Sequence, residues 1–201
     1  MANERSNIYL IGETIQPKEE SVEQALKKIG EMARQEMIPL AALQALIDEY
    51  DPWVQVNRAV MPEYPDWVKE LLYPELENTG PAKFDISTLE RWLHPKQVKG
   101  VAEGNEIHDC LKNKNLLADC LGYADLLAIR SRGVVFYRKH FSGKAVFGWK
   151  SAVRDHAGGL SVPCLIESDV RVGVDWGWLG SGWDSRSPAL RFASQPSGIE
   201  S

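Results

Sequence analysis

The sequence lacks the features that mark several large classes of protein. It has no apolar stretch of roughly 18 residues, the minimum for a membrane-spanning helix. Its first residues lack the basic-then-apolar pattern of a secretory signal, so we expect a cytoplasmic protein without a membrane partner. The three cysteines, Cys110, Cys120 and Cys164, form no C-x-x-C pair, which indicates neither a disulfide framework nor a zinc ribbon.

Residue patterns that carry catalysis are also missing. The four histidines show neither an H-E-x-x-H motif nor a ligand spacing to cysteine: His94, His108, His140 and His156. Gly180-Ser181-Gly182 is followed by Trp and Asp and does not resemble a phosphate loop. Lys150 and Ser151 are neighbours in an expected strand, where adjacent side chains point to opposite faces. The sequence therefore predicts no metal, no cofactor and no catalytic residue.

The residues that are present have the composition of a soluble globular protein. They are 44% hydrophobic and 25% charged, which excludes disorder of the whole chain. The net charge of -5 is unevenly distributed, because residues 130–156 carry seven basic residues and one acidic residue. We call these seven the basic belt: Arg130, Arg132, Arg138, Lys139, Lys144, Lys150 and Arg154. The belt suits a phosphate or an acidic partner, and an equally simple interpretation is that it faces the acidic helices of the same chain.

Apolar residues up to about residue 132 follow a helical spacing. We expect helices near 21–33, 40–50, 65–72, 87–93, 105–111 and 123–129. Ser21 with Gln24 and Ser87 with Glu90 form capping boxes, and the first two helices should pack as a hairpin. This part of the chain is predicted to be a helical bundle.

Beyond that point the apolar period changes to two, although 134–141 favours a helix. Val170, Val172, Val174, Trp176 and Trp178 alternate without interruption, and 145–153 and 160–166 are two further candidate strands. We expect an antiparallel meander with 170–178 at its centre and Val172, Val174 and Trp176 buried. The predicted fold class is therefore α+β, an N-terminal helical bundle followed by a small antiparallel β-meander. Residues 1–132 and 133–201 form its two portions, packed as one compact unit.

Several short blocks carry a family resemblance. They are Trp92-Leu93-His94, Gly148 to Ser151, Val162 to Leu165, Trp176 to Leu179 and Pro188 to Ser194. In their order and spacing they resemble a group of uncharacterised bacterial proteins, over roughly residues 67–194. The resemblance implies a bacterial, intracellular setting and adds no chemistry.

The tryptophans provide the second candidate binding element. Four of the seven lie between Trp149 and Trp183, where they either seal the core or form an aromatic wall beside a groove. We predict a non-enzymatic interaction or regulatory protein that binds a protein or peptide partner through the basic belt and the Trp-rich sheet. The predicted contact residues are Arg130, Arg132, Arg138, Lys139, Lys150, Arg154, Trp178 and Trp183.

An alternative function uses the same belt on nucleic acid. Asp155 and His156 lie in a polar turn and could supply a base to a nuclease-like site, and residues 105–132 could form a helix-turn-helix. The acidic residues within 105–132 oppose phosphate binding, and a solvated turn uses the same residue types as Asp155 and His156. Salt distinguishes the two hypotheses, since binding to phosphates weakens steeply with ionic strength.

Overall fold

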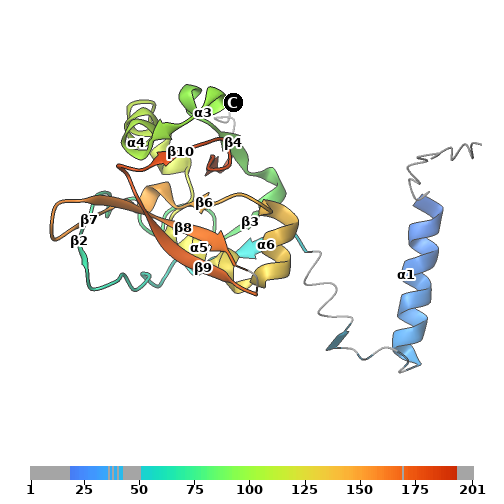
Figure 1. Ribbon diagram of the computed structural model, residues 1–201. Coiled ribbons are helices and arrows are strands. Elements are labelled where there is room, and N and C mark those ends of the chain that lie inside the picture. The colour runs from blue at the N-terminus through green and yellow to red at the C-terminus, as the bar shows by residue number, and fades with distance from the viewer. Residues whose placement is uncertain are drawn as a thin grey trace, which may run out of the picture. The chain divides into compact units, whose positions relative to one another are not determined.

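The computed structural model describes residues 19–35, 37, 39, 41–42, 51–168 and 170–193. Contacts divide the chain into two units, Met1–Asp48 and Glu49–Ser201, which we treat separately (Figure 1). In the first unit, helix α1 (Glu19–Arg34) confirms the helix expected near 21–33. The second expected helix, over 40–50, and its hairpin with the first lie almost entirely outside the described residues.

The second unit is built on one antiparallel sheet. Its strands are β2 (Val68–Leu71), β7 (Val153–Asp155), β8 (Leu160–Glu167), β6 (Val146–Phe147) and β9 (Val172–Trp178). The order is β2-β7-β8-β6, and β9 pairs with β8 along its whole length. β8 therefore lies at the centre of the sheet, between β9 on one side and β6 and β7 on the other (Figure 1).

Three short antiparallel ladders surround this sheet. β1 (Trp53–Gln55) pairs with β3 (Lys83–Asp85), β4 (Glu90–Trp92) with β11 (Ala189–Arg191), and β5 (Ala102–Glu103) with β10 (Gly182–Trp183). The 3-10 turns η1 (Ile86–Thr88), η2 (Leu117–Asp119) and η3 (Trp149–Ser151) connect these elements. Mixed helices and antiparallel strands make the protein α+β.

The helices are α3 (Pro95–Lys99), α4 (Gly104–Asn113), α5 (Tyr123–Ser131) and α6 (Gly133–Phe141). α4, α5 and α6 confirm the helices expected at 105–111, 123–129 and 134–141. The structure also places Ile107 and Leu111 of α4 in the core, as their spacing predicts. α5 and α6 lie against β8 and β9, and α4 lies beside β10 (Figure 1).

β8 separates two hydrophobic cores. Leu165 faces the first core, where it meets Leu126 of α5 and Tyr137 of α6. Val162 and Cys164 face the second core, built on α4 and Trp149. Because successive side chains of a strand point to opposite faces, a strand that is apolar on both faces can serve two cores at once.

Several expectations about the fold are wrong. The N-terminal helical bundle is not supported, because the expected helix over 65–72 is β2 and the one over 87–93 is η1 followed by β4. Runs of three or four residues are too short for periodicity to separate a helix from a strand. In both cases pairing with a distant strand, β7 or β11, decides the conformation.

The expected meander also needs correction. The stretch 145–153 is not one strand, since η3 interrupts it after Gly148. β9 forms an edge of the sheet rather than its centre, and Val170 lies before it and is 82% exposed. Of the side chains expected inside, Val172 is buried, whereas Val174 and Trp176 are half-buried.

Candidate functional site

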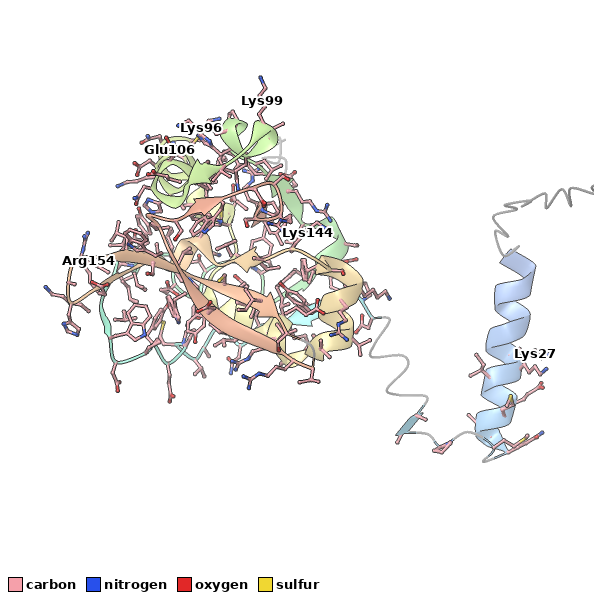
Figure 2. All side chains as sticks on the ribbon, viewed as in Figure 1. Lys27, Lys96, Lys99, Glu106, Lys144 and Arg154 are labelled. Atoms are coloured by element: carbon pink, nitrogen blue, oxygen red, sulfur yellow. The ribbon has the colours of Figure 1, made fainter. Side chains whose placement is uncertain are left out.

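The structure does not bring the basic belt together on one surface. Lys150 is only 1% exposed, and its Nζ donates to the carbonyl oxygen of Thr79 at 2.9 Å. Arg154 pairs with Glu70 at 3.0 Å across the β2–β7 ladder. Arg154 and Lys144 lie at opposite ends of the second unit (Figure 2).

The remaining members of the belt lie on or near α5 and α6. Arg138 pairs with Glu167 of β8 at 2.5 Å. Arg132 donates to the carbonyl oxygens of Asp51 and Trp53. These contacts are intramolecular, and they tie the helices to the sheet and to the β1 strand.

Arg130 has a different environment. It is exposed and lies seven residues after Tyr123 on the same face of α5. Burial raises the pKa of Tyr123, and the positive charge of Arg130 lowers it in part. The phenol of Tyr123 belongs to a group of four packed aromatic rings on one face of the sheet, which we call the aromatic cluster: Tyr64, Trp67, Tyr123 and Trp176. Arg130 is thus a basic-belt residue on the same helix face as Tyr123 of the aromatic cluster.

The aromatic cluster covers the end of β9. Trp176 lies at its centre, with ring centroids 5.1 Å from Trp67, 5.4 Å from Tyr123 and 6.0 Å from Tyr64. Trp67 remains 38% exposed. Trp178, two residues further along the same face of β9, is 60% exposed. This face of the sheet therefore presents large aromatic surface to solvent.

The two tryptophans predicted to bind a partner differ in position. Trp178 is exposed, whereas Trp183 packs between Phe147 and Trp149, with centroids at 4.7 and 5.5 Å. Trp149 is fully buried. Trp183 is thus a half-buried part of the second core, and Trp178 is the more accessible of the two.

β9 has a free edge in the part of the chain that the structure describes. Pro163 has no N–H, and its carbonyl oxygen accepts from Gly148 N on the β6 side at 2.8 Å. The pair Pro163–Trp176 therefore exchanges no hydrogen bonds, and in an antiparallel ladder bonded and non-bonded pairs alternate. Gly173, Asp175 and Gly177 bond inward to β8. It follows that the backbone groups of Val172, Val174, Trp176 and Trp178 point away from β8, and of these the Trp178 carbonyl oxygen accepts from Ser181 N at 2.9 Å.

A buried polar cluster lies beside the aromatic cluster. The hydroxyl of Ser151 donates to Glu77 Oε2 at 3.0 Å and accepts from the N–H of Tyr123 at 2.7 Å. Burial raises the pKa of the Glu77 carboxyl. Burial likewise raises the pKa of Tyr64, whose hydroxyl lies near Ser151 and Glu77. Glu77 Oε1 and the Tyr64 hydroxyl are buried without a well-aligned hydrogen-bond partner among the described residues.

Ionic contacts extend this cluster. Arg58 pairs with the fully buried Asp125 at 2.5 Å, and the other carboxylate oxygen of Asp125 accepts from Gly122 N at 2.7 Å. Burial lowers the pKa of Lys150.

A serine beside a carboxylate of raised pKa resembles a nucleophile and its base. Ser151 is fully buried, however, so the arrangement ties the segments around residues 58, 77 and 125 to η3 and offers no surface to a substrate.

Asp155 and His156, the residues of the alternative nuclease-like site, lie in the turn between β7 and β8. Asp155 Oδ1 accepts from the N–H groups of Ala157 and Gly159, both at 2.8 Å. His156 is exposed at the tip of the β7–β8 connection. These contacts are those of an Asx turn that closes the hairpin.

Sequence reasoning missed the buried polar cluster and the free edge of β9. The polar residues are far apart in the chain, and no motif joins them. The free edge could have been suspected from Pro163, since a proline within a strand limits which neighbour that strand can bond.

No model of a known protein family matches the chain, and no curated protein or solved structure matches it either. Within the described residues no three His, Cys, Asp or Glu side chains are grouped as metal ligands. No described helix is both long enough and apolar enough to cross a membrane.

Proposed function

We propose that the protein is a non-enzymatic interaction protein that binds an extended peptide segment of a partner as an added strand on the edge of β9. The supporting observation is the outward direction of the backbone groups of Val172, Val174, Trp176 and Trp178. Strand addition uses such groups for affinity, and it uses pockets beside alternate side chains for specificity.

The two faces of β9 define the chemistry of the peptide. On one face, Trp176 and the exposed Trp178 favour apolar side chains at alternate positions of the peptide. On the other face, Gly173 leaves open space and the Asp175 carboxylate is exposed. A lysine or arginine placed between two apolar residues would meet Asp175, so the expected ligand is apolar at alternate positions and basic between them.

Asp175 also explains how this edge avoids indiscriminate pairing. Its Oδ1 accepts from the N–H of Trp176 at 2.8 Å and thereby occupies one outward donor. Charged side chains on edge strands discourage aggregation. A peptide with a basic residue at this position neutralises Asp175, and its own carbonyl can take over the Trp176 N–H.

Part of the predicted basic belt fits the same surface. Arg130 lies on the same face of α5 as Tyr123 of the aromatic cluster and can contact an acidic group at one end of the peptide. Lys150 is buried, and Arg154 lies at the β2–β7 end of the sheet. The proposed contact residues are therefore Arg130, Trp176 and Trp178, together with the backbone of β9.

The test selects peptides from a random-sequence phage library against the full chain and measures their binding to two edge variants. Val174→Pro removes one outward N–H, and the preceding Gly173 accepts the extended conformation that proline demands. Val174→Thr keeps this N–H and serves as the matched control. We expect selected peptides to bind Val174→Pro at least about tenfold more weakly than Val174→Thr, a loss of about 1.4 kcal/mol.

Hydrogen exchange locates the binding. Bound peptide should slow exchange at Val174 and Trp178, whose N–H groups face outward. Peptides that bind Val174→Pro and Val174→Thr equally well would overturn the proposal. Self-association of the chain through this edge, detected by sedimentation and abolished in Val174→Pro, would identify a second copy as the occupant and contradict a peptide partner.

A further inference from the structure

The face of β9 that carries Asp175 also carries two glycines, and they differ in how they are covered. A Cβ added at Gly177 would lie 2.9 Å from Cζ2 of Trp183 and 3.2 Å from Cε1 of Phe147, so aromatic rings of the chain itself cover this glycine. A Cβ added at Gly173 would have no described atom within 4 Å. An aromatic ring that covers a glycine near the edge of a sheet stabilises the sheet at that point. Gly173 is the glycine of β9 that no described ring covers.

The open space at Gly173 exposes an apolar residue of the central strand. Ile166 lies directly opposite Gly173 in the β8–β9 ladder. On the same face of β8, Val162 is fully buried and Cys164 is 5% exposed, whereas Ile166 is 43% exposed. Because Gly173 has no side chain, the β9 side gives Ile166 no cover. An apolar surface therefore begins at the free edge of the sheet and reaches the central strand.

The surface beyond Ile166 leaves room for a side chain. A hollow of about 440 Å³ borders Ile166, and its other walls are Glu167 and residues 142–145, which join α6 to β6. This hollow is open to solvent and largely polar, so it is no apolar pocket by itself. It does leave the far side of Ile166 unobstructed for a ring that enters from β9.

An added strand places one of its residues directly opposite Gly173. The backbone groups of Gly173 bond inward to β8, so an antiparallel peptide meets Gly173 as a non-bonded pair, in which the side chains of the two strands lie closest. Adjacent strands are about 4.8 Å apart, which puts the backbone of Ile166 about 10 Å from that of the peptide. An alanine or valine is too short to cross this distance. An aromatic side chain can lie over Gly173 and contact Ile166.

We propose that the peptide bound at β9 carries an aromatic residue opposite Gly173, two positions after the basic residue that faces Asp175. The inference rests on the proposed function, since it concerns the peptide at the same edge. Antiparallel pairing is the more stable arrangement per residue, and in it the peptide residue opposite Asp175 precedes the residue opposite Gly173. The recognised motif is therefore Lys or Arg, an apolar residue opposite Val174, and then Phe, Tyr or Trp.

The test sequences the peptides that the full chain selects from the random-sequence phage library. The peptides counted are those that bind Val174→Thr at least about tenfold more tightly than Val174→Pro, because these use the edge of β9. We expect most of them to carry an aromatic residue two positions after Lys or Arg. Replacing this aromatic residue by alanine in one synthetic peptide should weaken its binding at least about tenfold.

Ile166 reports where the ring lies. The ring current of the aromatic peptide should move the methyl NMR signals of Ile166 upfield, and the alanine form of the peptide should not. Ile166→Ser changes an exposed side chain, and it should weaken the aromatic peptide at least about threefold while leaving the alanine form unchanged. Val98→Ser is the matched control, since Val98 is 65% exposed on α3, outside the sheet, and this variant should bind both peptides as the unmodified chain does.

The outcomes separate this inference from the proposed function. Edge-dependent peptides without an aromatic residue at this position, or equal effects of Ile166→Ser on the aromatic and alanine peptides, would overturn the inference and leave the proposed function standing. If no selected peptide depends on the N–H of Val174, the proposed function fails and this inference fails with it.

Discussion

Pro163 of β8 lies directly opposite Trp176 of β9, and this pairing fixes the direction of the backbone hydrogen bonds in β9. A shift of one residue would place Asp175 or Gly177 opposite Pro163, and it would turn every side chain of β9 to the other face. The same register therefore gives β9 both its outward backbone groups and its outward tryptophans. The proposed peptide-binding edge follows from one pair of residues.

The tryptophans should divide sharply by their contribution to stability. Trp178→Ala removes a side chain that is 60% exposed, so the free energy of unfolding should change by less than about 1 kcal/mol. Trp149→Ala empties a fully buried site in the second core and should cost about 3 to 5 kcal/mol. Urea denaturation measures both values. A large loss of stability in Trp178→Ala would show that this residue is structural rather than available to a partner.

Replacing Gly104 by alanine should lower stability, although alanine usually favours helices. Gly104 is the first residue of α4, and an added Cβ would lie 2.8 Å from both the carbonyl oxygen of Leu179 and the ring of Trp183. Gly104→Ala should therefore destabilise the protein by about 1 to 3 kcal/mol. Gly173→Ala is the matched control, because nothing lies within 4 Å of its added Cβ. Equal melting temperatures for the two variants would contradict this close packing.

The predictable part of the fold consists of its longer periodic segments. α4, α5 and α6 follow from apolar residues at helical spacing, and β8 and β9 follow from strict alternation. β1 to β4 each contain three or four residues, too few for a period to be recognised. Their partners are distant in the chain, as when β4 pairs with β11 about a hundred residues later, so tertiary pairing decides their conformation.

The candidate site was predictable only in part, for a related reason. Trp176 and Trp178 share one face of β9, and the sequence correctly placed them together. The difference in their exposure comes from Tyr64 and Trp67, which reach Trp176 from before β2. Lys150 was expected on the surface, yet its partner, the Thr79 carbonyl, is 71 residues away and could not be inferred locally.

Glu77 should make stability depend on pH in a defined direction. Its pKa is raised in the folded state, chiefly by burial, so the folded protein holds this proton more tightly than the unfolded chain. The associated stability is present below the ordinary value of 4.5 and is lost as pH rises through the folded pKa. Glu77→Gln keeps an acceptor for Ser151 and cannot ionise. Its free energy of unfolding should increase relative to the unmodified chain between about pH 4 and pH 8.

Urea denaturation at several pH values tests this expectation. Glu167→Gln is the control, since it removes the carboxylate of a surface ion pair with Arg138 instead of a buried carboxyl. Parallel curves for Glu77→Gln and the unmodified chain would show that Glu77 does not carry the pH dependence.

The two ion pairs Arg58–Asp125 and Arg138–Glu167 have the same separation, 2.5 Å, and should differ greatly in the cost of breaking them. Asp125 is fully buried, so Asp125→Ala leaves the guanidinium of Arg58 without its counter-charge and the N–H of Gly122 without its acceptor. Removing one partner of a buried pair costs about 3 to 5 kcal/mol. Glu167→Ala breaks a pair whose arginine is 45% exposed to water, and such pairs contribute about 0 to 1 kcal/mol.

Thermal and urea unfolding of the two variants, at equal ionic strength, should therefore show free energies of unfolding that differ by at least about 2 kcal/mol. Similar losses of stability in both variants would contradict the expectation that burial of Asp125, and not the distance alone, sets the strength of its ion pair with Arg58.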